Sequence, residues 1–258
     1  MITAGVDVGL MNTKIVILRD KEVAAQRTKQ SGGGGRGETV KEIWQDALKD
    51  AGIKPKDISK VVATGTGKKD VSFADKTVVE AVAAARAARF LYPESTSVVD
   101  AGADMTHVVT LGEGNTIREV VMNQKCMNGL GLVIEVMADR LGLTLDEISA
   151  LAPAQGKTNP VNDGCPVFAE LDALGLLNIG VDRREVAGAV TDAVVVRLSS
   201  ILNDKIRPQK DTTVFIGGLA KNLAVTERLK ERSGIHFLIP ENAEYGGALG
   251  AAVIATDM

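Results

Sequence analysis

The stretch GVDVGLMNTKIVIL, residues 5–18, ends one apolar, β-branched run with Asp7 and Gly9 and then begins a second such run. Residues 2–8 and 14–19 therefore predict a β-hairpin with these two residues near its turn. The pattern returns about 90 residues later in VVDAGADMTHVV, residues 98–109, with Asp100 and Gly102 in the same places. Two such hairpins, each carrying one aspartate, predict two similar subdomains that face one another.

Two further glycine turns lie near the C-terminus, in VFIGGLAKN (residues 214–222) and in YGGALGAA (residues 245–252). Tight glycine turns let backbone N–H groups approach phosphate oxygens, because no Cβ stands in the way. An aspartate beside such a turn can hold Mg²⁺, usually through its water ligands. One turn of this kind is common in ordinary hairpins, whereas four in this order predict a site for nucleotide phosphates.

The rest of the chain reads as alternating strands and helices, with a third strand at 21–29, helices at 38–52 and 76–91, and a strand at 61–64. The glycine-rich residues 31–37 predict a loop, either a flexible connector or a phosphate cradle without a Walker lysine. Lys68, Lys69 and Asp70 are interpreted as a solvated loop or a partner contact. Glu80 and Glu135 are interpreted as surface residues, His107 and His236 as structural ones, and Trp44 as part of the core.

The four turns together resemble the sugar kinase/heat-shock chaperone/actin superfamily of ATPases. The resemblance implies an α/β fold of two ribonuclease-H-like, actin-like ATPase subdomains with ATP in the cleft between them. Residues 1–95 plus 246–258 would form the first subdomain, and residues 96–245 the second. Two alternatives share the fold: a small-molecule kinase, which needs a carboxylate base beside its substrate, and a non-catalytic ATP-binding sensor or assembly protein.

The resemblance also assigns roles to residues of the turns. Asp7 and Asp100 would hold Mg²⁺ and orient the attacking water, while Asp104 either activates that water or caps a turn. The expected contacts to ATP or ADP are Gly9, Asn12, Thr13, Lys14, Gly102, Ala103, Gly217, Gly218, Asn222, Gly246 and Gly247.

Cys126 and Cys165, the two cysteines of the chain, each lie at or near the start of a predicted helix. A helix N-terminus stabilises a thiolate, the form of cysteine that binds iron, although two cysteines can also be small buried core residues. They lack CxxC spacing, and a [4Fe–4S] cluster usually takes four cysteine thiolates. Two chains of this kind supply four, so a cluster would lie on a dimer axis or on a pseudo-axis with a related subunit.

The motifs KCMNGLG (residues 125–131) and CPVFAE (residues 165–170), with VATGTGKK (residues 62–69), are similar to one branch of the superfamily. This branch contains the activators of 2-hydroxyacyl-CoA dehydratases and the ATPase subunits of benzoyl-CoA reductase, and the similarity runs from Gly5 to Ala255. It implies a dimer, of identical or related subunits, that shares one [4Fe–4S] cluster. ATP hydrolysis would drive a low-potential electron, from ferredoxin or flavodoxin, into a catalytic acyl-CoA reductase or dehydratase component.

One turn departs from this branch, since residues 100–105 read DAGADM where Asp-x-Gly-Gly-Gln-Asp is usual. The departure favours a reductase subunit over a free-standing activator. The composition excludes other classes: the formal net charge of the 258 residues is −3, and no basic block predicts nucleic-acid binding. No run of 18 apolar residues predicts a membrane span, so a cytoplasmic protein is expected.

Overall fold

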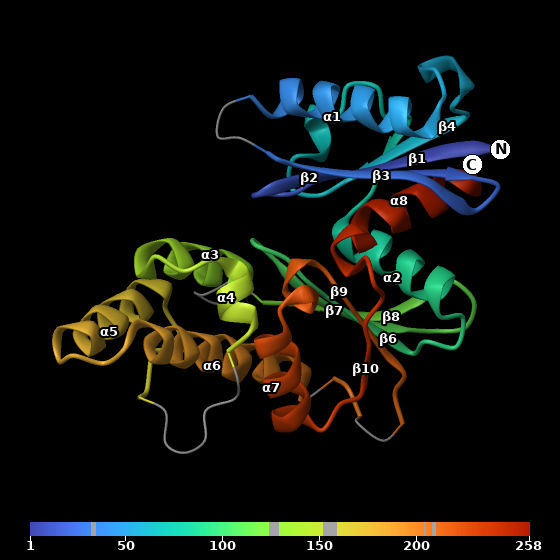
Figure 1. Cartoon of the computed structure of the whole chain (residues 1–258). Coiled ribbons are helices and arrows are strands. Elements are labelled where there is room, and N and C mark those ends of the chain that lie inside the picture. The colour runs from blue at the N-terminus through green and yellow to red at the C-terminus, as the bar shows by residue number, and fades with distance from the viewer. Residues whose placement is uncertain (32–34, 124–128, 152–158, 204, 208–209) are drawn as a thin grey trace.

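The computed structural model describes residues 1–31, 35–123, 129–151, 159–203, 205–207 and 210–258. Within them lie two five-stranded sheets, one above the other in Figure 1. The first has the order β3-β2-β1-β4-β5 and the second the order β10-β9-β6-β7-β8. The first sheet consists of β1 Ile2–Val8, β2 Asn12–Arg19, β3 Glu22–Gln30, β4 Lys60–Thr64 and β5 Lys76–Thr77. The second consists of β6 Ser97–Ala101, β7 Thr106–Leu111, β8 Ile117–Met122, β9 Thr213–Ile216 and β10 Phe237–Leu238.

The two sheets are built alike. In each sheet, three strands that follow one another in the chain pair antiparallel. Two further strands continue the sheet parallel to the first of the three: β4 and then β5 next to β1, and β9 and then β10 next to β6. This confirms the internal repeat predicted from the two hairpins, and with it the α/β fold of two similar halves.

The first sheet is covered on both faces because its strand residues alternate between two cores. Helix α1 (Arg36–Ala51) packs on the face that carries Val6, Ile15 and Ile17, and its Trp44 ring lies 4.5 Å from that of Phe73. Helix α8 (Gly246–Thr256) packs on the opposite face.

The second sheet is covered by α2 (Glu80–Leu91) on the face of Val98 and Ile216, and by helices that follow β8 on the face of Val99 and Phe215. Helix α2 also lies along α8, so that two helices stand between the sheets (Figure 1). Although α2 falls in the segment 1–95, it packs on the second sheet, whereas α8 covers the first. The division of the chain into residues 1–95 plus 246–258 and residues 96–245 stays a prediction.

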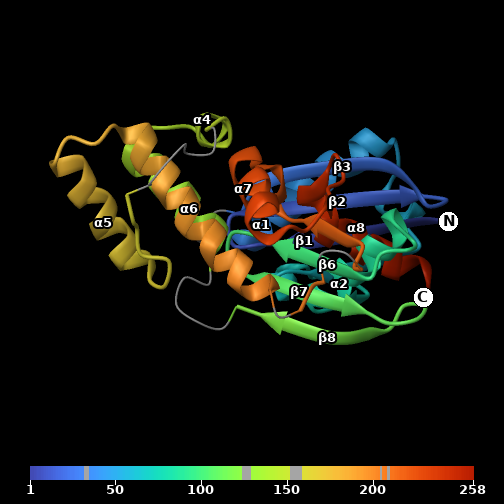
Figure 2. The same ribbon diagram turned by 90° about the horizontal axis from the view of Figure 1, so that it is seen from below.

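The additional helices lie on one side of the second sheet (Figures 1 and 2). They are α3 Leu130–Leu141, α4 Leu145–Ser149, α5 Pro166–Asn178, α6 Arg183–Leu202 and α7 Leu223–Ser233. Helix α6 contacts α3, α5 and α7, and α5 lies farthest from the sheets in both views. Short 3-10 turns occur at η1 Pro55–Asp57, η2 Lys68–Asp70, η3 Gly218–Lys221 and η4 Ala243–Tyr245.

The helix predicted over residues 76–91 begins later, at Glu80. Lys76 and Thr77 instead pair with Val62 and Ala63 as the edge strand β5, which keeps the chain extended as far as Val79. Among the described helices, none has both the length and the apolar character needed to cross a bilayer.

Candidate nucleotide-binding site

Two tight turns of the same geometry end β1 and β6. The Gly9 N–H donates to the Asn12 carbonyl at 3.1 Å, and the Gly102 N–H donates to the Met105 carbonyl at 3.0 Å. Each turn follows an aspartate by two residues, so Asp7 and Asp100 occupy equivalent places at the same ends of the two sheets.

A glycine with positive φ stands beside each aspartate. Gly65 follows β4 with φ 89°, and a Cβ there would lie 2.5 Å from Asp7 Oδ1. Gly217 follows β9 with φ 94°, and a Cβ there would lie 2.8 Å from Asp100 Oδ1. Any other residue would be strained in this conformation and would press on the carboxylate, so these glycines keep both carboxylates free to face the cleft.

The two turns line one cavity of about 280 Å³ between the halves. It contains most of the predicted site residues: Asp7, Gly9, Asn12, Lys14, Asp100, Gly102, Ala103, Asp104, Gly217, Gly218 and Gly247. Sequence segments far apart in the chain thus converge as the four predicted turns require.

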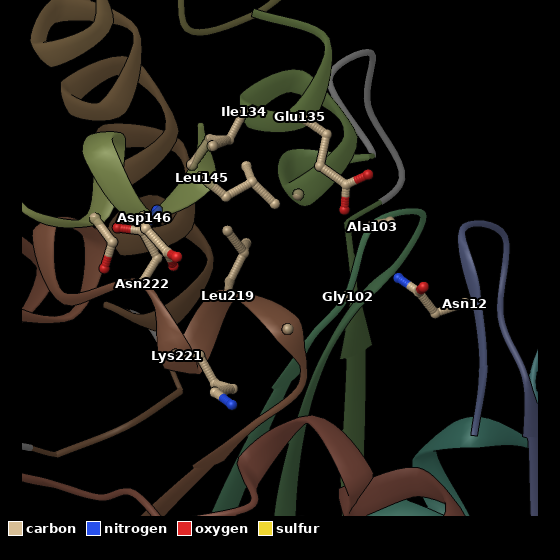
Figure 3. A pocket seen from close by; sticks show the side chains of 13 residues that line it. Asn12, Gly102, Ala103, Ile134, Glu135, Leu145, Asp146, Leu219, Lys221 and Asn222 are labelled. Atoms are coloured by element: carbon tan, nitrogen blue, oxygen red, sulfur yellow. The ribbon is translucent and has the colours of Figure 1, made fainter. Parts of the chain in front are cut away.

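A second cavity of about 290 Å³ adjoins the first and is shown in Figure 3. The residues that line both cavities are Asn12, Gly102, Ala103, Glu135 and Gly218. Beyond this junction the second cavity has apolar walls from α3, α4 and η3, formed by Ile134, Leu145 and Leu219. Asp146, Ser149, Lys221 and Asn222 add polar groups. An apolar slot with a few polar groups, joined to a cavity of glycine turns, fits a nucleoside joined to phosphates.

The first cavity is strongly acidic. Burial raises the pKa of Asp100 to about 7, and the negative charge of Asp7 adds to that rise. Burial also raises the pKa of Asp7, against the opposing charge of Lys14, whose Nζ lies 3.8 Å from Asp7 Oδ2. Because the negative charge of Asp7 disfavours ionisation of Asp100, a cation beside the two carboxylates would be stabilised.

Mg²⁺ fits this pair better than a metal with an all-protein ligand set. Mg²⁺ is usually held by one or two carboxylates, while water and phosphate fill its other positions. Asp7 and Asp100 could supply those carboxylates. The described part of the chain holds no group of three or more His, Cys, Asp or Glu side chains suited to a metal ion.

The model of one protein family matches residues 4–255. The chain belongs to the BadF/BadG/BcrA/BcrD ATPase family. The activator of lactoyl-CoA dehydratase from Anaerotignum propionicum is 34% identical over 99% of this chain and 97% of its own length. One of the subunits of benzoyl-CoA reductase from Thauera aromatica is 27% identical over 98% of this chain and 92% of its own length.

Among solved structures, the activator of 2-hydroxyisocaproyl-CoA dehydratase from Clostridium difficile with bound ADPNP matches with a TM-score of 0.89. It is 29% identical and covers 100% of this chain and 95% of its own. The family resemblance seen in the sequence motifs and the actin-like ATPase fold are thereby confirmed.

Not every predicted site residue of this ATPase-family chain lines a cavity. Thr13 is fully buried, its Oγ1 lies 3.1 Å from Ser31 Oγ, and that hydroxyl donates to the Gly9 carbonyl at 2.9 Å. Thr13 therefore supports the first turn indirectly, through Ser31. Gly246 packs against Ile216, since a Cβ there would lie 2.6 Å from Ile216 Cδ1. Asn222 lines the second cavity and also caps α7 by accepting from the Val225 N–H at 3.1 Å.

Four residues near the turns have a different setting from the surface, structural or loop positions that the sequence patterns indicate. Glu80, His107 and Glu135 line the first cavity. Lys68 lies in a 3-10 turn beside the cavity, with Nζ 3.6 Å from Glu80 Oε1 and a donated bond to the Gly65 carbonyl at 3.1 Å. The predicted helix start at 76 places Glu80 one turn inside the helix, whereas it is the first residue of α2. The feature that indicates its place in the cavity is that Glu80 opens α2 directly after an extended segment.

The second turn is bonded directly to the start of α3. The Gly131 N–H donates to the Gly102 carbonyl at 3.2 Å, and the Leu132 N–H donates to the Ala103 carbonyl at 3.1 Å. A Cβ on Gly129 or on Gly131 would lie 2.7 Å from one of these carbonyl oxygens. Only glycine lets the chain pass this close, so α3 and the turn form one unit.

Of the two cysteines, Cys126 lies outside the described residues. Cys165 is the N-cap of α5 and Pro166 the first helical residue, as the sequence predicts. Asn162 Oδ1 accepts from the Gly164 N–H at 3.0 Å and from the Cys165 N–H at 2.8 Å. The Asn162 N–H in turn donates to Asp172 Oδ2 at 2.9 Å, which ties the cysteine to the second turn of α5.

Proposed function

We propose that this chain hydrolyses ATP in order to drive an electron into a catalytic partner that acts on an acyl-CoA. The partner would be a 2-hydroxyacyl-CoA dehydratase or a benzoyl-CoA-type reductase, as the names of the relatives indicate. One observation carries the proposal: the glycine turn beside Asp100 is hydrogen-bonded to the start of α3, which begins four residues after Cys126 in the sequence. A change at the phosphates would therefore reach the first turn of α3, which follows Cys126 in the sequence, through backbone hydrogen bonds.

In this proposal the nucleoside occupies the cavity of Leu145 and Leu219, and the phosphates extend across the junction toward Asp7 and Asp100. Backbone N–H groups near Gly9 and Gly102 donate to phosphate oxygens, and Lys14 offsets part of the negative charge. Asp7 and Asp100 would hold Mg²⁺ and orient water for attack on the terminal phosphate. Bound Mg²⁺ would supply positive charge to offset the negative charge that develops on the ADP leaving group and on the transferred phosphoryl group.

Asp104 and Asn12 line the phosphate cavity as well, and Asn222 lines the nucleoside cavity. We assign Asp104 to the water side of the phosphates and Asn222 to the nucleoside side. Thr13 supports these contacts indirectly, through Ser31 and the carbonyl of Gly9.

The cysteines would provide two thiolates to a [4Fe–4S] cluster shared with a second chain, identical or related. When bound, the cluster would supply a low-potential, one-electron centre. The setting of Cys165 fits this role. It is an N-cap residue whose backbone N–H donates to Asn162, and it lies at the start of a helix with an exposed apolar face. Val167, Phe168, Leu171 and Leu174 of that face are 62%, 57%, 56% and 47% exposed.

A second chain placed against α5 would cover this face. Exposed apolar patches of this kind mark contact surfaces in soluble proteins. Ferredoxin or flavodoxin is the expected electron donor, and the need for ATP and reduced thiols favours a reaction in the cytoplasm.

The relatives favour a separate activator over a reductase subunit, since the lactoyl-CoA dehydratase activator is 34% identical and the benzoyl-CoA reductase relative 27%. This preference is opposite to the one that the altered DAGADM turn indicates. The overall identity samples nearly the whole chain and therefore outweighs one turn.

The test is iron and acid-labile sulfide in protein purified without oxygen, for the wild type, C126A, C165A and D100N. We expect about four iron atoms per two chains in the wild type and in D100N, and their loss in both cysteine variants. ATP hydrolysis should persist in the cysteine variants and disappear in D100N. A wild-type protein that hydrolyses ATP without binding iron would refute the electron-transfer proposal and favour a small-molecule kinase.

A further inference from the structure

The two hairpins differ in the residue that stands opposite the aspartate. In the first, Asp7 pairs with Lys14 across β1 and β2, and in the second, Asp100 pairs with His107 across β6 and β7. Directly opposed residues of antiparallel strands project from the same face of a sheet. His107 therefore holds, in the second half, the place that Lys14 holds in the first.

The side chain of His107 is enclosed but faces the nucleotide cavity. It is 4% exposed and belongs to the cavity lining. Among the described residues, no hydrogen bond or ion pair engages its ring. Its ring nitrogens are not among the fully enclosed side-chain atoms of the described residues that lack a partner, so the ring keeps contact with the cavity. A bound ligand is the partner that the cavity offers.

The position of His107 within the cavity indicates which part of a nucleotide it meets. The junction with the nucleoside cavity is formed by residues such as Asn12, Ala103 and Gly218. His107, like Lys14 and Glu80, lines only the phosphate cavity. A nucleotide that enters with its base beyond the junction would reach these residues with its last phosphate.

Burial lowers the pKa of His107, against the opposing effect of the negative charge of Glu80. A neutral imidazole still donates one N–H, but it attracts phosphates far less than a lysine does at a distance. Such a donor stabilises a phosphate that contacts it directly and has little effect on a phosphate farther away. This behaviour suits a group that distinguishes a triphosphate from a diphosphate.

We propose that His107 donates a hydrogen bond to the terminal phosphate of ATP and is thereby the residue of the second half that distinguishes ATP from ADP. This inference rests on the proposed function, since it requires a nucleotide in the cleft. Lys14 contributes charge from the first half and favours both nucleotides, whereas His107 contributes a contact that exists only while the terminal phosphate is present.

The experiment compares the Kd of ADPNP with that of ADP, both with Mg²⁺, for the wild type, H107A, H107Q and H236A. His236 is exposed and lies outside both cavities, so H236A is the matched control. We expect H107A to weaken ADPNP binding about tenfold and ADP binding less than about twofold. H107Q keeps an N–H donor of similar reach and should retain part of the preference for ADPNP.

A second measurement does not depend on a variant that folds. In ¹⁵N-histidine-labelled wild-type protein, ADPNP should shift the ring signal of His107 more than ADP does, while the signal of His236 stays in place. Equal losses of ADP and ADPNP affinity in H107A and H107Q, or a His107 signal that responds equally to both nucleotides, would overturn the inference. A wild-type protein that binds neither nucleotide would overturn the proposed function as well.

Discussion

The packing of α2 along α8 joins the two halves, and one glycine decides how closely these helices approach. A Cβ added at Gly250 of α8 would lie 1.8 Å from the carbonyl oxygen of Ala83 in α2 and 2.6 Å from its carbonyl carbon. Both atoms belong to helix backbone and cannot rotate away. Ordinary contacts between heavy atoms are about 3.5 Å, so in Gly250→Ala the helices must separate by roughly 1.5 Å.

The expected loss of stability combines two opposing terms. Overpacking of a close contact costs about 1–3 kcal/mol, and a clash with backbone belongs at or above the upper end. Alanine regains about 1 kcal/mol through its higher helix propensity. A net loss of about 2 kcal/mol should lower the Tm of the nucleotide-free protein by about 4–8 °C in a calorimetric scan.

The same substitution should weaken nucleotide binding, because each helix contributes to the phosphate cavity. Helix α2 begins with Glu80 and α8 carries Gly247, where a Cβ would lie 3.0 Å from Asp7 Oδ2. Gly175 of α5 is the matched control, since nothing lies within 4 Å of an added Cβ there. Gly175→Ala should raise stability by up to about 1 kcal/mol. A Gly250→Ala protein as stable as the wild type would refute the close approach of the two helices.

Three further predictions concern the acidic pair, the link to α3 and the apolar face of α5. Folding raises the pKa of Asp100 from 3.8 to about 7, so the folded chain binds the proton more tightly than the unfolded chain. The free energy of unfolding therefore falls as pH rises through this range. D100N should therefore raise the Tm of the nucleotide-free protein at pH 8 while removing stabilisation by Mg²⁺ and ATP, and a lower Tm would contradict the assignment. In Gly131→Ala the added Cβ would lie 2.7 Å from the Gly102 carbonyl oxygen and should disturb the bonds between the turn and α3. In a C165S background, this change should abolish the effect of ADPNP on the alkylation rate of Cys126. An unchanged effect would contradict the proposed coupling through α3. Leu171→Glu should shift sedimentation from dimer to monomer, whereas the same change at Val23, 51% exposed on β3, should leave the dimer intact.

Much of the proposed phosphate site follows from the sequence alone. The apolar runs that end in Asp7 and Asp100 predict strands, and their repetition predicts two equivalent sheets whose strand ends meet. The turns at Gly9 and Gly102 have the same backbone hydrogen bond because the same short spacing separates each glycine from its acceptor residue. Local patterns were sufficient here, since each turn is built from residues adjacent in the chain.

Glu80 and His107 could not be placed in this way. The role of Glu80 depends on α2 crossing to the second sheet, and helical periodicity does not indicate which sheet a helix covers. His107 looks like any histidine within a strand until the register opposite Asp100 is known. Apolar character alone does not show that residues of α5 such as Phe168 are exposed, and the structure leaves them so.

The difference between the halves explains how one cleft could both hold a nucleotide and respond to its hydrolysis. A nucleotide shifts a conformation only by its differential affinity for the two states, and ATP differs from ADP only in the terminal phosphate. Residues of the proposed nucleoside cavity, such as Leu219, would therefore contribute affinity but no switch. The conformational response to hydrolysis must therefore begin in the part of the cavity that Lys14 and His107 line. In the second half the turn that follows Asp100 is bonded directly to α3, because the Gly102 and Ala103 carbonyls accept from the Gly131 and Leu132 N–H groups, so a change at this turn would be passed to α3.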